Sequence, residues 1–155
     1  MRDEIHELRE DVLNEEALIE ETIKRLKQIR KRVSTEVADE MMEPALGTCL
    51  MNFYNGIENI LKRICKVYYQ SPVLRSPNWH KELLDCSYQP PSGKNPVLSR
   101  DVVERLYQYK NFRHRFISGY GFQLKLEKML VLVENVEILW LQVKQEIDQF
   151  FKKVS

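Results

Sequence analysis

The segment FRHRFISGYGF, residues 112–122, holds the side chains of this chain that are best suited to chemistry. Arg113 carries a guanidinium that can bind a phosphate through two hydrogen bonds, and His114 carries an imidazole, the side chain used most often for acid–base catalysis. On a continuous helix, Arg113 and Tyr120 would share one face, because they are about seven positions apart. Ser118 would point about 140° away from Arg113 at about 100° per residue. Arg113 and Ser118 converge only if the helix ends between them, which the glycines of the segment permit.

An arginine that faces inward in a helical bundle is costly unless it is paired or lines a polar cleft. We therefore predict a polar cleft at the end of this helix, with Arg113 in it. Residues 100–128 carry seven Lys or Arg against three acidic residues. Lys110 and Arg115 are accordingly expected to bind a phosphate-bearing partner. The residues alone leave one alternative, which is a helix C-terminus with incidental cations.

The chain offers no other recognisable catalytic motif. It contains no Gly-rich phosphate loop, no HExxH and no GxSxG. The three histidines, His6, His80 and His114, are too scattered in the sequence to form an obvious metal site. We therefore predict no metal and no cofactor, and we expect His80, in the run WHKELL, to make a structural hydrogen bond.

Composition limits the classes of protein that fit. A chain of 155 residues can form one domain, 1–155, with a proper core. Apolar residues make up 43% and charged residues 30%, which is typical of a soluble globular protein. No apolar run approaches the roughly 20 residues that span a bilayer, and the charged start MRDEIHELRE is unlike a signal peptide. We expect a cytoplasmic protein without membrane contact, whose odd set of cysteines, Cys49, Cys65 and Cys86, are buried thiols.

The spacing of apolar residues predicts helices and no convincing strand. Four helices are predicted, at residues of about 2–36, 44–70, 99–118 and 123–153. The apolar seam of the first helix is predicted to pass through Glu15 and Thr22, and Ser99 is expected to cap the third helix. Between the second and third helices, a Pro-rich loop contains a short helical turn around 79–85. The predicted fold class is therefore all-α, an antiparallel four-helix bundle.

Several stretches of the chain resemble the HepT-like branch of the HEPN superfamily. They are FYNGIENILKRI at 53–64, WHKELL at 79–84, and FRHRFISGYGFQL followed by LEKMLVLVENVEILW, and the resemblance covers roughly 44–153. It implies a HEPN-type helical bundle that forms a homodimer. Such proteins serve as the toxin component beside a minimal nucleotidyltransferase antitoxin, and active members are metal-independent RNA endonucleases. Their signature is an arginine, four to six residues, a histidine, one residue and a tyrosine.

The resemblance also implies roles for individual residues. Arg113 matches the arginine of the signature, which lines a cleft at the dimer interface. Tyr120 matches the tyrosine that the partner nucleotidyltransferase can modify with AMP. Ser118 stands where the signature has its histidine, and a serine hydroxyl does not titrate near neutral pH as a histidine does. His114, four residues before Ser118, is the nearby candidate to replace that histidine.

Two classes of function follow. The first is a toxin component of the HepT type, an RNA endonuclease with a degenerate motif in which Ser118 replaces the histidine. The second is a catalytically inactive HEPN module that binds a nucleotidyltransferase, nucleic acid or both. A generic four-helix interaction protein is a third alternative, which a monomeric state in solution would favour.

Overall fold

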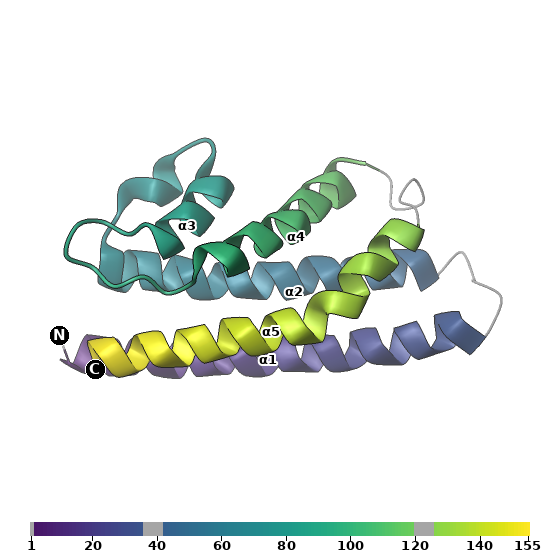
Figure 1. The fold of residues 1–155 in the computed structure, drawn as a ribbon, viewed down its shortest axis with the longest axis horizontal. Coiled ribbons are helices and arrows are strands. Elements are labelled where there is room, and N and C mark those ends of the chain that lie inside the picture. The colour runs from purple at the N-terminus through teal and green to yellow at the C-terminus, as the bar shows by residue number, and fades with distance from the viewer. Residues whose placement is uncertain (1, 36–41, 120–125) are drawn as a thin grey trace.

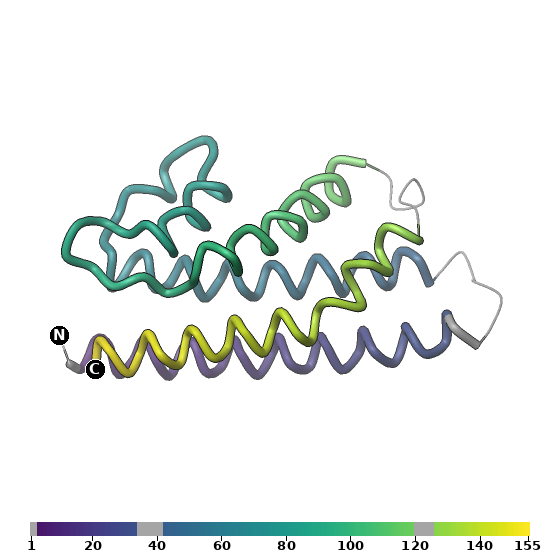
Figure 2. Tube along the Cα trace, in the orientation of Figure 1, coloured from purple at the N-terminus to yellow at the C-terminus, as the bar shows by residue number. Residues whose placement is uncertain are grey.

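The computed structural model describes residues 2–35, 42–119 and 126–155, and every regular element in these ranges is helical (Figure 1). Its four long helices are α1 (Arg2–Thr35), α2 (Met42–Ile64), α4 (Arg100–Ser118) and α5 (Leu126–Val154). Consecutive long helices run in opposite directions, so the start of α1 and the end of α5 lie at the same end of the bundle (Figure 2). The predicted all-α bundle is confirmed.

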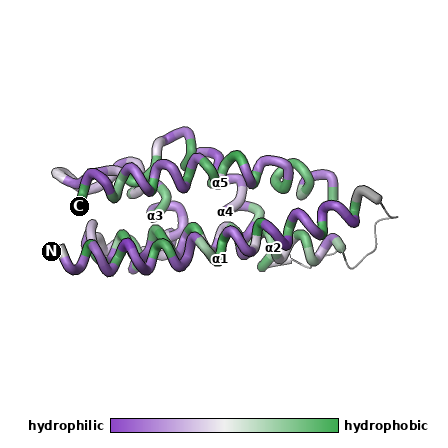
Figure 3. Tube along the Cα trace, turned by 90° about the horizontal axis from the view of Figure 1, so that it is seen from below, coloured by the Kyte–Doolittle hydropathy of each residue, from purple (hydrophilic) through white to green (hydrophobic). Residues whose placement is uncertain are grey.

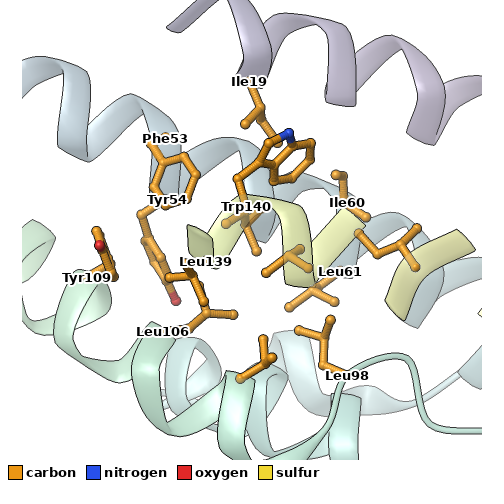
Figure 4. Packing of buried hydrophobic residues seen from close by; sticks show 14 of the residues in the cluster. Ile19, Phe53, Tyr54, Ile60, Leu61, Leu98, Leu106, Tyr109, Leu139 and Trp140 are labelled. Atoms are coloured by element: carbon orange, nitrogen blue, oxygen red, sulfur yellow. The ribbon is translucent and has the colours of Figure 1, made fainter. Parts of the chain in front are cut away.

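Helix α2 is the centre of the molecule, because it packs against α1, α3, α4 and α5. One apolar face of α2 is completely buried, and its residues include Leu46, Leu50, Phe53, Ile57 and Ile60. Figure 4 shows this core, in which Phe53 and Ile60 of α2 lie among Ile19 of α1, Leu106 of α4 and Trp140 of α5. Burying one such Leu or Ile side chain stabilises the fold by roughly 1.5–3 kcal/mol.

Two glycines let neighbouring helices approach α2 closely. A Cβ atom at Gly56 would lie 2.4 Å from Cγ1 of Ile19, and one at Gly47 would lie 2.4 Å from Cε2 of Phe116. The first contact sets how near α1 comes to α2. The second does the same for the last turns of α4, which carry Arg113.

Helices α1 and α5 lie antiparallel, and polar contacts along their length fix how they face each other. Arg9 Nη2 donates to Asp148 Oδ1 at 2.9 Å near one end, and Arg30 Nε donates to Glu134 Oε1 at 2.8 Å near the other. In Figure 3, hydrophilic and hydrophobic residues alternate along both helices. This alternation is the pattern of amphipathic helices with one buried and one solvated face.

The segment between α2 and α4 is more ordered than a Pro-rich loop. Helix α2 continues into a π-helical turn, η1 (Cys65–Tyr69), which ends at Gln70 in the left-handed conformation with φ 53°. A 3₁₀ turn, η2 (Pro72–Arg75), follows, and then α3 (Trp79–Tyr88). The short turn predicted at 79–85 is thus the first part of a ten-residue helix. Leu83 and Leu84 of α3 are buried, and this anchors α3 on the bundle.

Helix α4 has the boundaries that its sequence predicts. The Ser99 hydroxyl accepts a hydrogen bond from Val102 N, which confirms the predicted N-cap. The helix ends at Ser118, and Gly119 N donates to Arg115 O at 3.0 Å. Gly119 has φ −111°, an extended conformation open to any residue, so the helix ends here without a left-handed glycine.

Candidate functional site

Arg113 lies on the inward side of α4, at the spacing of the buried residues Leu106 and Tyr109. It is half-buried, and its Nε donates to Oδ1 of Asn55 on α2 at 2.5 Å. Asn55 is a neutral amide, so this contact orients the guanidinium without neutralising its charge. The inward arginine predicted from the sequence is therefore present, and one hydrogen bond compensates part of its desolvation.

A second polar pair lies one turn further along α2. Glu58 is only 2% exposed, and its Oε2 is 2.7 Å from Nδ1 of His80 on α3. The side chain of His80 is 32% exposed. His80 sits three and four positions before the buried Leu83 and Leu84, so packing of these leucines turns the imidazole toward α2. The hydrogen bond expected for His80 is confirmed, and Glu58 is its partner.

Trp79 packs against the imidazole of His80. Its ring is stacked on the His80 imidazole, with 3.6 Å between the ring centroids. Lys62 Nζ lies 4.4 Å from the centre of the Trp79 ring, in cation–π geometry. Stacking and the hydrogen bond to Glu58 together hold the imidazole in one orientation.

Asn55, Glu58 and Lys62 therefore form a single row on α2, which we call the α2 polar strip. Their spacing of three and then four residues places them on one side of a helix. Residues of α3 and α4 contact this row, His80 and Trp79 from α3 and Arg113 from α4. Two further helices, α3 and α4, thus bring an imidazole and a guanidinium to the same face of α2.

Tyr54 lies under the strip and is completely buried. Figure 4 shows its side chain extending from α2 toward Leu106 on α4. Burial, and to a lesser extent the Glu58 carboxylate, raise the pKa of the Tyr54 hydroxyl well above its usual range, while Arg113 acts in the opposite direction. The charges of Arg113 and Glu58 therefore both influence the Tyr54 hydroxyl. A phenol with so high a pKa keeps its proton at neutral pH.

The other residues singled out from the motif lie differently. The Ser118 hydroxyl donates to the backbone carbonyl of His114, within its own helix. Ser118, His114 and Arg115 are all exposed, and none of them contacts Arg113 among the residues that the structure describes. Lys110 Nζ lies 6.0 Å from the centre of the Tyr107 ring. The tyrosine of the motif, at position 120, falls outside the described residues.

A surface depression of about 440 Å³ lies elsewhere, between α1 and α2. Lys62, Arg63 and Lys66 line it together with Asp11 and Glu15. Arg63 Nη1 is 3.4 Å from Asp11 Oδ2, so part of its positive charge is already balanced. This depression is less suited to a phosphate than the surroundings of Arg113 are.

Other kinds of site are not supported by the described residues. They contain no group of three His, Cys, Asp or Glu side chains placed to hold a metal ion. Among the described helices, none is both long and apolar enough to cross a lipid bilayer. The three cysteines are buried free thiols, as predicted. Burial raises the pKa of Cys86 to about 11, which keeps this thiol protonated and unreactive at neutral pH.

Asn55, Glu58 and His80 were not predicted as parts of one site. The sequence contains a signal for two of them, because Asn55 and Glu58 are the only strongly polar side chains between Tyr54 and Ile60 apart from Asn59. Their spacing places them on one side of α2. Nothing in the sequence indicates that α3 brings His80 to this position.

Fold and site together define a class of protein, an all-α bundle with an oriented arginine on the inward side of its penultimate long helix. The chain belongs to the family of HepT-like proteins, whose pattern matches residues 45–154. This match confirms the resemblance to the HepT-like branch of the HEPN superfamily. No curated protein and no solved structure matches the chain significantly.

Proposed function

We propose that this chain is the toxin-type component of a toxin–antitoxin pair and acts as a metal-independent RNA endonuclease. The observation that carries the proposal is the placement of Arg113, half-buried, oriented by a neutral amide, and next to a second polar pair on α2. A guanidinium held in this way can bind the phosphate of an RNA strand bidentately. Membership of the HepT-like family supports the same reading.

The proposal includes the partners that the resemblance implies. The active form is a homodimer with Arg113 near the interface between the two copies. A minimal nucleotidyltransferase is the antitoxin, and it neutralises the toxin by transferring AMP to Tyr120. Lys110 and Arg115 extend the positive charge around Arg113 along α4 and contribute to RNA binding through their charge.

A second function, RNA binding without cleavage, is favoured by one observation. The hydroxyl of Ser118, which replaces the motif histidine, is bonded back to its own helix at His114 O. Its proton is donated to the backbone, and a serine hydroxyl does not titrate near neutral pH as the motif histidine would. On this reading Arg113 binds a phosphate and nothing nearby completes the reaction.

The first test is cleavage of a defined single-stranded RNA in the presence of EDTA by three proteins, unmodified, Arg113→Ala and Ser118→His. The proposal expects the unmodified protein to cut and Arg113→Ala to be inactive. Cleavage by Ser118→His alone would assign the natural protein to the second function. Absence of cleavage by all three would leave an RNA-binding or protein-binding module.

RNA binding separates these outcomes further. Asn55→Asp places a carboxylate beside Arg113, which neutralises the charge available to a phosphate, so weaker RNA binding is expected. Asn59→Asp is the matched control, because Asn59 is an exposed residue of the same helix and the charge change is identical. Fluorescence anisotropy with a labelled RNA measures the RNA affinity of both variants. Equal weakening by the two variants would argue against Arg113 as the phosphate contact.

A further inference from the structure

His80 has the arrangement of a proton-transfer group rather than of a fully enclosed structural residue. An ionised carboxylate only accepts hydrogen bonds, so a neutral imidazole opposite an ionised Glu58 would donate the 2.7 Å contact from Nδ1. The lone pair of the neutral ring is then on Nε2. Within the described part of the chain, Nε2 has no hydrogen-bond partner, and the side chain is 32% exposed. A buried carboxylate that orients a histidine in this way is a recurring device of acid–base catalysis.

The partners of His80 and Arg113 on α2 place these two side chains near each other. Their hydrogen-bond partners on α2, Asn55 and Glu58, are three positions apart, which corresponds to about 5–6 Å between Cβ atoms on one side of a helix. Arg113 and Glu58 both act on the hydroxyl of Tyr54. A phosphate held by Arg113 would therefore lie within one helical turn of the Glu58–His80 pair.

We propose that His80, positioned by Glu58, supplies the acid–base chemistry for RNA cleavage that Ser118 cannot supply. This inference rests on the proposed function, since it requires an RNA phosphate on Arg113. His80 is the catalytic residue, because its Nε2 contacts the reacting hydroxyl. Glu58 is a positioning residue that fixes the tautomer and the direction of the ring.

The reaction balances without a metal or a further reagent. Nε2 of neutral His80 accepts the proton of a ribose 2′-hydroxyl, and the 2′-oxygen forms a bond to the adjacent phosphorus. The bond from phosphorus to the 5′-oxygen of the next nucleotide breaks, and that oxygen takes up a proton, from the imidazolium or from water. The products are a 2′,3′-cyclic phosphate end and a 5′-hydroxyl end. Arg113 stabilises the negative charge that builds up on the phosphoryl oxygens.

Trp79 and Lys62 add a means of positioning the strand. The Trp79 ring is stacked on the imidazole of His80 and has the Lys62 ammonium over it, so a nucleobase would stack on this ring by displacing the ammonium. A base stacked there would present its own ribose to His80. Single-stranded RNA is the substrate that this arrangement fits, since a paired base cannot leave its stack without cost.

The test compares the unmodified protein with His80→Gln, Glu58→Gln, the double variant Glu58→Gln/His80→Gln and His6→Gln. Two quantities are measured with EDTA present, cleavage of a labelled single-stranded RNA and binding of the same strand with 2′-deoxyribose, which cannot be cut. His80→Gln is expected to lower the cleavage rate by about 10²–10⁴-fold and to leave binding unchanged. His6, an exposed histidine of α1, is the matched control, and its replacement should change neither quantity.

Glu58→Gln has a distinguishing readout in the pH dependence of the rate. Glu58 of α2 contacts His80 directly, Lys62 lies over the Trp79 ring that is stacked on His80, and Arg113 of α4 reaches the same row through Asn55. Removing the single negative charge among them disfavours the imidazolium. The rate should then rise at lower pH than in the unmodified protein, in addition to being lower. A residue with only a structural role would change the rate at all pH values alike.

Three results would overturn the inference. Arg113-dependent cleavage that His80→Gln leaves intact would refute it, while the proposed function would stand. Arg113-dependent RNA binding with no cleavage by the unmodified protein would refute it as well. If the unmodified protein neither binds nor cuts RNA, the proposed function itself is rejected. If His80→Gln fails to fold, judged by circular dichroism, the double variant removes the buried charge together with the imidazole and gives the same comparison.

Discussion

At the scale of single residues, two glutamates of α1 show how burial decides the sign of a charge effect. Glu16 is 3% exposed, and burial raises the pKa of its carboxyl, opposed by Arg9 and Lys144. Glu20, one turn later, is exposed. Hydrogen bonds from Lys144 Nζ at 2.6 Å and Trp140 Nε1 at 3.0 Å lower its pKa. The two carboxyls therefore contribute to stability in opposite pH ranges.

We predict that Glu16→Gln raises the melting temperature at neutral pH. A carboxyl whose pKa is raised in the folded state stabilises the fold at low pH, and this contribution is lost as the pH rises through its folded pKa. Arg9 keeps its 2.9 Å partner Asp148 in the variant, so no buried charge is left alone. The gain should be about 1 kcal/mol at pH 7 and should vanish below about pH 4. Thermal melts followed by circular dichroism from pH 4 to 8 measure it.

Glu20→Gln is the control, and its change in melting temperature at neutral pH should have the opposite sign. The pKa of Glu20 is lowered, so its contribution is present above the ordinary carboxyl range and is lost as the pH falls through the folded pKa. The variant should melt slightly below the unmodified protein at neutral pH. If Glu16→Gln and Glu20→Gln shift the melting temperature in the same direction, burial is not what distinguishes the two carboxyls.

The candidate site was predictable from the sequence only in part, and the reason lies in the range of the contacts. The inward placement of Arg113 followed from the spacing within one helix. The partners did not, because Asn55 is 58 positions away from Arg113 and His80 is 22 positions away from Glu58. Periodicity gives the direction in which a side chain points within its own helix, and it contains no information on which helix lies opposite.

At the scale of elements, the seam of α1 shows a smaller error of the same kind. A strict heptad placed Glu15 and Thr22 in the seam, whereas Glu16 and Ile23 are the buried residues. An α-helix has 3.6 residues per turn, so a straight helix drifts by about 20° per heptad away from a 3.5-residue repeat. The long helices were otherwise predicted within a few residues, because each buries a continuous apolar stripe.

Close packing of α1 on α2 depends on Gly56. A Cβ atom at this position would lie 2.4 Å from Cγ1 of the buried Ile19, so Gly56→Ala should force the two helices apart. The overpacking costs about 1–3 kcal/mol, and alanine returns up to about 1 kcal/mol through its higher helix propensity. We expect a net loss of about 1 kcal/mol in the free energy of unfolding, measured by urea denaturation.

A double-mutant cycle with Ile19→Ala identifies the cause. Ile19→Ala removes the Cγ1 atom that the new methyl group would meet, so the two changes together should destabilise less than the sum of each alone. Additive effects would mean that the loss in Gly56→Ala arises from something other than this contact.

At the scale of the whole molecule, large apolar side chains remain exposed on more than one helix, and three of them, Val131, Ile138 and Leu141, lie on one side of α5. Ile117 of α4 is 56% exposed and lies four positions after Arg113, on the same side of the helix. Ile138 of α5 is 60% exposed. An exposed isoleucine beside Arg113 is what the proposed dimer interface would need, since interface cores are apolar.

The proposed homodimer can therefore be tested with two matched substitutions. Ile117→Glu would bury a charge at an interface beside Arg113 and should raise the dimer dissociation constant by about 100-fold or more. Ile138→Glu introduces the same charge at a similarly exposed isoleucine of another helix and should leave the dimer intact. Size-exclusion chromatography with light scattering distinguishes a dimer from the single chain of 18.5 kDa. Dissociation by Ile138→Glu alone would move the interface to α5 and away from Arg113, and a monomeric unmodified protein would exclude a shared site altogether.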